Sequence, residues 1–70
     1  MDKIKIYYHK DSDTMDLWFG NPEDEVSCEE VGEGVILKKD KFGKTIGIEK
    51  LYVSKTVGIN QPLPVELVVA

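Results

Sequence analysis

The sequence predicts a mainly β protein, β-rich α+β at most, whose antiparallel sheet of five or six short strands is built from two hairpins with at most one short helix. Apolar and polar residues alternate in several runs of about five residues, the period of half-buried strands. Turn-forming residues separate these runs, and no long apolar stripe of helical period is present. The 70 residues indicate one small domain, 1–70, with a thin core, because such a chain buries only about 60% of its unfolded surface.

The first hairpin is predicted over residues 4–19. Residues 4–8 alternate in polarity, residues 10–14 form a cluster of turn formers, and residues 15–19 resume the alternation. This pattern places Met15, Leu17 and Phe19 on one face of the strand and Asp16 and Trp18 on the other.

Residues 20–25 interrupt the strands. Asn21 precedes Pro22 and three acidic residues, the order of an N-cap, a first-turn proline and carboxylates that complement a helix dipole. Because no apolar stripe follows, we expect a single helical turn. Residues 26–31 then form a short third strand, and residues 32–34 a tight connection.

A second hairpin is predicted from residues 35–39 and 45–49 around the turn at 40–44. Asp40 begins this turn and Gly43 stands three residues later, which fits a type I turn with Gly43 free to adopt positive φ. Gly47 within the fifth strand indicates a bulge or the close approach of a large side chain.

The C-terminal third is less regular. Residues 51–58 fit either an extension of the strand or one short helix. Residues 60–64 form a loop, and residues 65–69 are expected to form a final short strand at a sheet edge. A sheet with one apolar face and little helical cover must curl on itself or pair with a second copy, so we expect a homodimer.

Charge and composition restrict the partners and the compartment. Thirteen acidic residues and nine lysines, without arginine, give a net charge of −4, which makes nucleic acid an improbable partner. Residues 1–35 hold ten acids and three lysines, whereas residues 36–70 hold three acids and six lysines. We interpret this asymmetry as cross-strand pairing; a steering surface for a charged partner is the alternative.

The expected compartment is the cytoplasm. No apolar run reaches the length of a signal peptide or a membrane span, so no membrane association is expected. A single cysteine, Cys28, fits a reducing environment.

Two stretches of the chain resemble a known family. Tyr8–Leu17 reads Y-H-K-D-S-D-T-M-D-L, and Glu29–Leu51 reads E-E-V-G-E-G-V-I-L-K-K-D-K-F-G-K-T-I-G-I-E-K-L. They resemble a widespread family of short bacterial and archaeal proteins of unknown function, with the pattern Y-D-x-x-x-D-x-L-x-I and then G-V-x-x-x-x-D-x-x-G-x-x-x-G-I-E. The matching positions are Tyr8, Asp13, Met15, Leu17, Gly34, Val35, Asp40, Gly43, Gly47, Ile48 and Glu49; His9 departs from the pattern.

The resemblance covers roughly residues 4–55 and implies a small β-rich fold in a microbial cell. It supplies no established activity and no functional residues. Some members are encoded beside small toxin-like proteins, so the resemblance permits an antitoxin-like role.

Three carboxylates of the first turn, Asp11, Asp13 and Asp16, are the candidate metal ligands. Calcium prefers several oxygen ligands, which an acidic turn can supply. The spacing fails the EF-hand pattern, because the fifth position from Asp11 is Met15 and the twelfth is Pro22. Polar turn residues that bond their own backbone are the competing interpretation, and the one we favour.

No catalytic group and no cofactor site is predicted. A pair of His9 and Cys28 would need a pocket and an orienting group. His9 is expected on the solvated face with Lys5 and Tyr7, and Cys28 lacks a neighbouring cation. No phosphate-binding glycine motif or metal-binding cysteine motif occurs.

Two surfaces are candidates for contacts with other molecules. Tyr7 and Trp18 fall on the face opposite the predicted core, where exposed aromatics favour an interface; a second core layer is the alternative. Four lysines gather near Phe42 in the second hairpin, at positions 38, 39, 41 and 44. They either contact an acidic partner or keep the sheet edge soluble, with Glu29 and Glu30 as predicted counter-ions.

These observations favour a small non-enzymatic protein that acts by protein–protein interaction, through dimerisation. In a narrower, antitoxin-like form of this hypothesis, the protein also binds a small protein partner. The alternative is a module that binds a divalent metal or small ligand at the Asp11–Asp16 turn.

Overall fold

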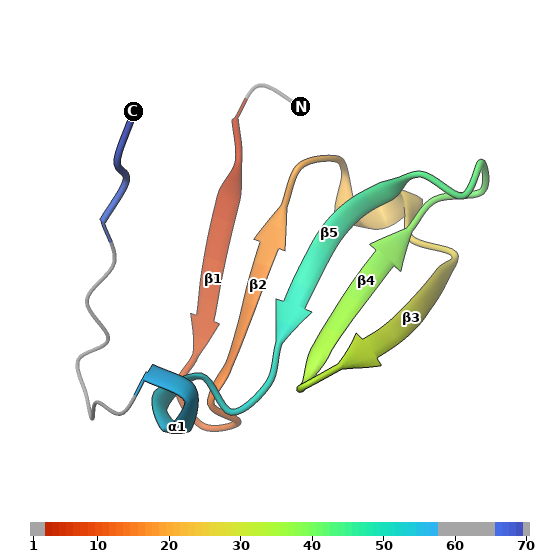
Figure 1. Ribbon diagram of the computed structural model, residues 1–70. Helices are drawn as coiled ribbons and strands as arrows, with labels where there is room; N and C mark the ends of the chain where they lie inside the picture. Colours follow the sequence, from red (N-terminus) through yellow and green to blue (C-terminus); the bar gives the residue numbers. More distant parts are fainter. Residues whose placement is uncertain (1–2, 58–65, 70) are drawn as a thin grey trace.

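The computed structural model describes residues 3–57 and 66–69. Its elements are β1 (Lys5–His9), β2 (Thr14–Trp18), a 3₁₀ turn η1 (Pro22–Asp24), β3 (Ser27–Gly32), β4 (Val35–Lys39), β5 (Thr45–Lys50) and the helix α1 (Val53–Val57). The strands form one antiparallel sheet in the order β1-β2-β5-β4-β3 (Figure 1). The predicted fold class is therefore confirmed, with five strands among the described residues.

The first hairpin follows the predicted alternation. Ile6 pairs with Leu17, and Tyr8 with Met15. Because directly paired residues of an antiparallel sheet share a face, Met15 and Leu17 lie with the apolar residues of β1. Phe19 lies just beyond β2 and is exposed.

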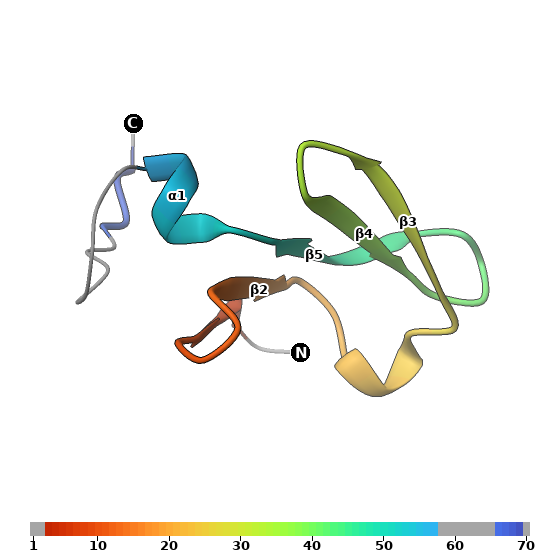
Figure 2. The ribbon, with the colours of Figure 1, turned by 90° about the horizontal axis from the view of Figure 1, so that it is seen from below.

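The segment between β2 and β3 forms the single helical turn that the sequence predicts. The Asn21 side chain accepts a hydrogen bond from the Glu23 backbone N–H at 3.0 Å, and Pro22 opens the turn. Figure 2 shows η1 and α1 on opposite sides of the sheet. Neither is long enough to cover a face.

The turn between β4 and β5 depends on Asp40 and Gly43. Asp40 Oδ1 accepts hydrogen bonds from the backbone N–H groups of Phe42 at 2.9 Å and Lys44 at 3.0 Å. Gly43 adopts φ +80°, a conformation that costs glycine little. The predicted turn, closed by the hydrogen bond from the Gly43 N–H to the Asp40 carbonyl at 3.0 Å, and the positive φ of Gly43 are therefore confirmed.

Gly47 lies directly under the Trp18 ring. The two residues are paired across β2 and β5, and a Cβ atom on Gly47 would lie 2.6 Å from Cε3 of Trp18. The expected close approach of a large side chain is therefore present. The neighbouring Ile46 is the extra residue of a β-bulge opposite Lys38 and Lys39, and its carbonyl accepts from the N–H groups of both Phe19 and Gly20.

The segment after β5 becomes the short helix α1 at the end of the sheet beside the β1–β2 turn (Figure 1). This decides between the two possibilities for residues 51–57 in favour of a helix. The expected final strand is wrong for Glu66–Val69, which adopt no regular structure and are exposed. The expected loop at 60–64 lies outside the described residues.

The core is thin. Only Trp18, Ile46 and Val53 are buried among the apolar side chains that the structure describes. No described helix has the length and apolar character to cross a membrane.

We predict that Gly47→Ala lowers the free energy of unfolding by about 1–3 kcal/mol, because the new methyl group overpacks against Trp18. Urea titration followed by far-UV circular dichroism measures the loss. In a Trp18→Leu background the same change should cost less, since the ring that it strikes is gone. An equal cost in both backgrounds would contradict this account of Gly47.

Candidate interaction surface

One face of the sheet is apolar, and its side chains are half-buried or exposed. Strand registers bring together Ile6, Tyr8, Met15, Leu17, Val35, Leu37 and Ile48, which we call the apolar face. Two consecutive rows cross it: Ile6, Leu17, Ile48 and Leu37 form one, and Tyr8, Met15, Lys50 and Val35 the other. Not one of its seven apolar side chains is buried, and Ile6 is 48% exposed. Exposed contiguous apolar surface of this kind is typical of interaction sites.

Within residues 3–57 and 66–69, the sheet has β1 and β3 as its edge strands. There, β1 pairs with β2 alone and β3 with β4 alone. The β1 edge carries Lys5, with Lys3 and Lys10 on either side, whereas β3 carries Glu29 and Glu30. The two edge strands therefore differ in charge, and the β3 edge is one to which a further strand could add.

The opposite face is polar and internally compensated. Lys38 Nζ lies 3.1 Å from Glu49 and 3.5 Å from Glu25. Partial burial of Lys38 disfavours its charge, but these two carboxylates outweigh that cost and raise its pKa above 10.5. At the β3 side of the apolar face, where Glu29 pairs with Leu37, Lys39 Nζ contacts Glu29 Oε1 at 2.6 Å and lowers the pKa of that carboxyl below 4.5. Pairing between the acidic and basic halves of the chain is therefore confirmed for Glu25 and Glu29.

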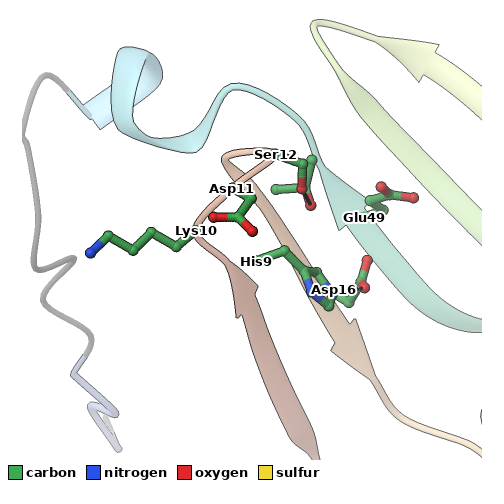
Figure 3. A pocket seen from close by; sticks show the side chains of 7 residues that line it. His9, Lys10, Asp11, Ser12, Asp16 and Glu49 are labelled. Carbon is green, nitrogen blue, oxygen red and sulfur yellow. Dashed lines mark hydrogen bonds and ion pairs between the residues drawn. The ribbon is translucent and has the colours of Figure 1, made fainter.

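A shallow hollow of about 570 Å³ opens on this polar face beside the β1–β2 turn. Its lining residues are His9, Lys10, Asp11, Ser12, Thr14, Asp16 and Glu49. Figure 3 shows His9 and Asp16 meeting within it, at 2.9 Å between Nε2 and Oδ2, and Lys10 extending away. Asp16 faces Glu49 directly across β2 and β5, an unfavourable pairing of like charges. Each of these carboxylates has a partner of its own: His9 pairs with Asp16, and Lys38 pairs with Glu49.

The three candidate metal ligands have separate roles. Asp13 accepts hydrogen bonds from the Ser54 hydroxyl at 2.7 Å, the Ser54 N–H at 3.0 Å and the Tyr8 hydroxyl at 2.8 Å. Asp16 is paired with His9, and Asp11 is exposed. No group of three or more histidine, cysteine or carboxylate side chains in the described part of the chain is arranged to hold a metal ion.

Asp13 joins the first turn to α1. Its own carbonyl accepts from the Val53 N–H at 3.1 Å, while its carboxylate receives Ser54, so the start of α1 is held by a residue forty positions earlier in the chain. The hydrogen bond from the Ser54 hydroxyl outweighs partial desolvation and lowers the pKa of the Asp13 carboxyl below 3.8. Sequence reasoning missed this role, since nothing in the spacing of Asp13 and Ser54 indicates the contact.

The two candidate interface aromatics differ in exposure. Trp18 is buried at 8% exposure, which corrects the expectation that it is exposed. This burial agrees with the alternative interpretation, in which Trp18 belongs to a second core layer, because its ring packs on Gly47. Tyr7 is 46% exposed and stacks with His9 at 6.5 Å between ring centroids, so the prediction of an interface there stands.

The remaining candidates lie apart from one another. Cys28 is exposed on β3, at the opposite edge of the sheet from His9. Phe42, at the tip of the lysine-rich hairpin, is 82% exposed, with Lys41 Nζ 5.2 Å from its ring centroid. The fold therefore does not bring Cys28 and His9 together as a nucleophile and a base.

A family model described as a protein of unknown function (DUF2283) matches residues 5–54. The match covers most of the chain, so the chain belongs to this family. No curated protein and no solved structure matches it.

We predict that Asp13→Asn destabilises the fold at neutral pH more than Asp11→Asn does. Both changes remove one negative charge from the same turn, but only Asp13 accepts hydrogen bonds from α1 and Tyr8. Thermal unfolding of the two variants measures the difference, and amide chemical shifts of Ser54 report the loss of the contact. Equal melting temperatures would contradict the role assigned to Asp13.

The low pKa of Asp13 also sets a pH dependence. Its contribution to stability is present above its pKa in the unfolded chain, about 3.9, and is lost as the pH falls through the lower value in the folded protein. The unmodified protein should therefore lose more stability below about pH 4 than Asp13→Asn does. Urea titrations at pH 3 and pH 7 test this sign.

Proposed function

We propose that this member of a family of unknown function is a non-enzymatic protein of the bacterial or archaeal cytoplasm that acts by protein–protein interaction, as a homodimer formed through its apolar face. One observation carries the proposal: seven apolar side chains share a face of the sheet, and none is buried. A sheet in water normally buries such a face against a second layer.

A second copy of the chain is the partner that we favour, because a two-fold dimer buries the same patch of both subunits and needs no other protein.

The charges favour the apolar face over the polar face as the dimer contact. On the polar face, Lys38 is held by Glu25 and Glu49, and His9 by Asp16. Burying these pairs would cost desolvation energy without a new counter-charge from an identical surface. The two rows of the apolar face hold a single charged side chain between β1 and β4, Lys50, whose ammonium reaches the carbonyls of Glu33 and Leu51.

The dimer is tested by sedimentation, which should give a mass near 15.8 kDa, twice 7.9 kDa. Ile6→Lys and Tyr7→Lys form a matched pair, because the two residues are adjacent on β1, 48% and 46% exposed, and on opposite faces. We expect Ile6→Lys to weaken the dimer at least about tenfold and Tyr7→Lys to have little effect. If Tyr7→Lys weakened the dimer more than Ile6→Lys, the dimer contact would lie on the polar face and not on the apolar face. A protein that is monomeric at all concentrations would overturn the proposal.

An antitoxin-like role is a narrower form of the same proposal. It is supported by the β3 edge, which pairs only with β4 among the described residues and can accept a strand from a small protein. If the product of the adjacent gene is toxic, co-expression should restore growth and the two proteins should co-purify at a fixed ratio. Failure to bind would remove this role and leave the dimer proposal intact.

A further inference from the structure

We propose that the outer edge of β3 and the hollow at its start form one binding site for a basic, extended segment of a partner protein. The inference rests on the proposed protein–protein interaction and names the chemistry of a partner other than a second copy. Among the described residues β3 pairs with β4 alone, and every residue of Ser27–Gly32 is exposed. The backbone of this strand is therefore placed to hydrogen-bond an added strand.

The β3 edge carries a carboxylate on each face of the sheet. Glu29 pairs with Leu37 on the apolar face, and Glu30 pairs with Ile36 on the polar face. Glu29 already contacts Lys39 at 2.6 Å, whereas the exposed Glu30 carboxylate has no hydrogen bond or ion pair within the described residues. Because side chains alternate across a strand, two consecutive residues of an added strand each meet a carboxylate. Two adjacent basic residues match this edge best.

The same carboxylates exclude other occupants of the edge. Two copies of β3 in antiparallel pairing would bring four carboxylates to one junction, where they repel one another. Pairing β3 of one copy with β1 of the next is head-to-tail and would build an open fibre. The β-bulge at Val31 also shortens the regular ladder to Ser27–Glu30. Charges and bulges of this kind protect sheet edges, and here a short strand of opposite charge is the one that they admit.

A hollow of about 410 Å³ opens at the start of this edge, between η1 and the β4–β5 turn. Both of these segments lie at the end of the sheet where β3 begins (Figures 1 and 2). The lining residues of the hollow are Glu23, Asp24, Val26, Asp40, Lys41 and Phe42.

The hollow suits the side chain of a lysine or an arginine. Val26 and Phe42 are 65% and 82% exposed and offer apolar surface to an aliphatic stem. Three carboxylates against one lysine favour a cationic head, although Asp40 Oδ1 also accepts two backbone N–H groups. Lys41 Nζ lies 5.2 Å from the Phe42 ring centroid, so the ring is placed to attract an ammonium group.

The edge and the hollow together specify a spacing in the partner. On its inner side β3 pairs antiparallel with β4, which reads V-I-L-K-K, and we expect the outer strand to run antiparallel as well. Val26 lies three positions before Glu29. A partner with adjacent basic residues beside Glu30 and Glu29 therefore brings its third following residue to the hollow. The expected pattern is two basic residues, two β-forming residues and a third basic residue.

The site is tested with the synthetic peptide T-K-K-V-T-K-V, blocked at both ends and titrated into the isotopically labelled full chain. We expect saturable shifts of the Ser27–Glu30 and Phe42 amide signals at peptide concentrations up to about 5 mM, the weak affinity of a short strand. The control peptide T-E-E-V-T-E-V should cause none of these shifts, because its charges repel those of the edge.

Two matched charge reversals separate the edge from a general attraction between peptide and protein. Glu30 and Asp11 are both exposed carboxylates, and Asp11 lies in the β1–β2 turn at the other side of the sheet. We expect Glu30→Lys to weaken binding of T-K-K-V-T-K-V at least about threefold, since an ion pair becomes a like-charge contact. Asp11→Lys changes the net charge equally and should change the affinity less than about twofold.

Phe42→Ala tests the hollow with a second pair of peptides. The variant should bind T-K-K-V-T-K-V at least about threefold more weakly than the unmodified protein, because the ring no longer attracts the third lysine. It should bind T-K-K-V-T-T-V, which lacks that lysine, with unchanged affinity. Equal affinities of the variant and the unmodified protein for T-K-K-V-T-K-V would overturn the part of the proposal that includes the hollow.

The outcomes distinguish this site from the proposed dimer. Absence of shifts at Ser27–Glu30, equal binding of the lysine and glutamate peptides, or equal effects of Glu30→Lys and Asp11→Lys would each overturn the site. The dimer, which sedimentation tests, would then still stand. Conversely, a protein that sediments as a monomer and binds the peptide as expected would lose the dimer and keep the site, because one chain contains all of it.

Discussion

The packing of Trp18 on Gly47 holds the two halves of the sheet together. The β1–β2 hairpin is joined to the three strands β3, β4 and β5 by the pairing of β2 with β5, and Trp18 and Gly47 are directly opposite at that junction. A tryptophan ring contributes a large apolar surface, and glycine lets it lie against the backbone. In a core with so few buried side chains, this contact favours the pairing of β2 with β5 and so the strand order.

The position of Trp18 distinguishes the two faces of the sheet. The ring packs on Gly47 on the polar face, where Lys38 also pairs with Glu25 and Glu49. On the other side, α1 lies at one end of the sheet, where Asp13 holds it through Ser54. The two central rows of apolar side chains remain half-exposed, and this imbalance is the physical basis of the proposed dimer.

Much of the fold follows from local chemistry that the sequence displays. Alternating polarity predicted β1 and β2 with their faces, Asn21 and Pro22 predicted the single helical turn, and Asp40 with Gly43 predicted the turn between β4 and β5. The candidate interaction site was harder to predict. Its residue types were visible, but the face expected to form the core is half-exposed, and Trp18, expected at the surface, is buried. Whether an apolar residue is covered depends on layers above the sheet, which polarity alternation does not report.

The sequence by itself determined the strands, the turns and the residues that share each face, because these depend on neighbours within a few positions. Tertiary structure decided the strand order, the burial of Trp18 over Gly47, the helix at Val53–Val57 and the anchoring of that helix by Asp13. Each of these depends on residues that are distant in the chain. Asp13 shows the difference most clearly: as one acid among several in a polar turn it resembled a weak metal ligand, and in the folded chain its oxygens are used to hold the start of a helix.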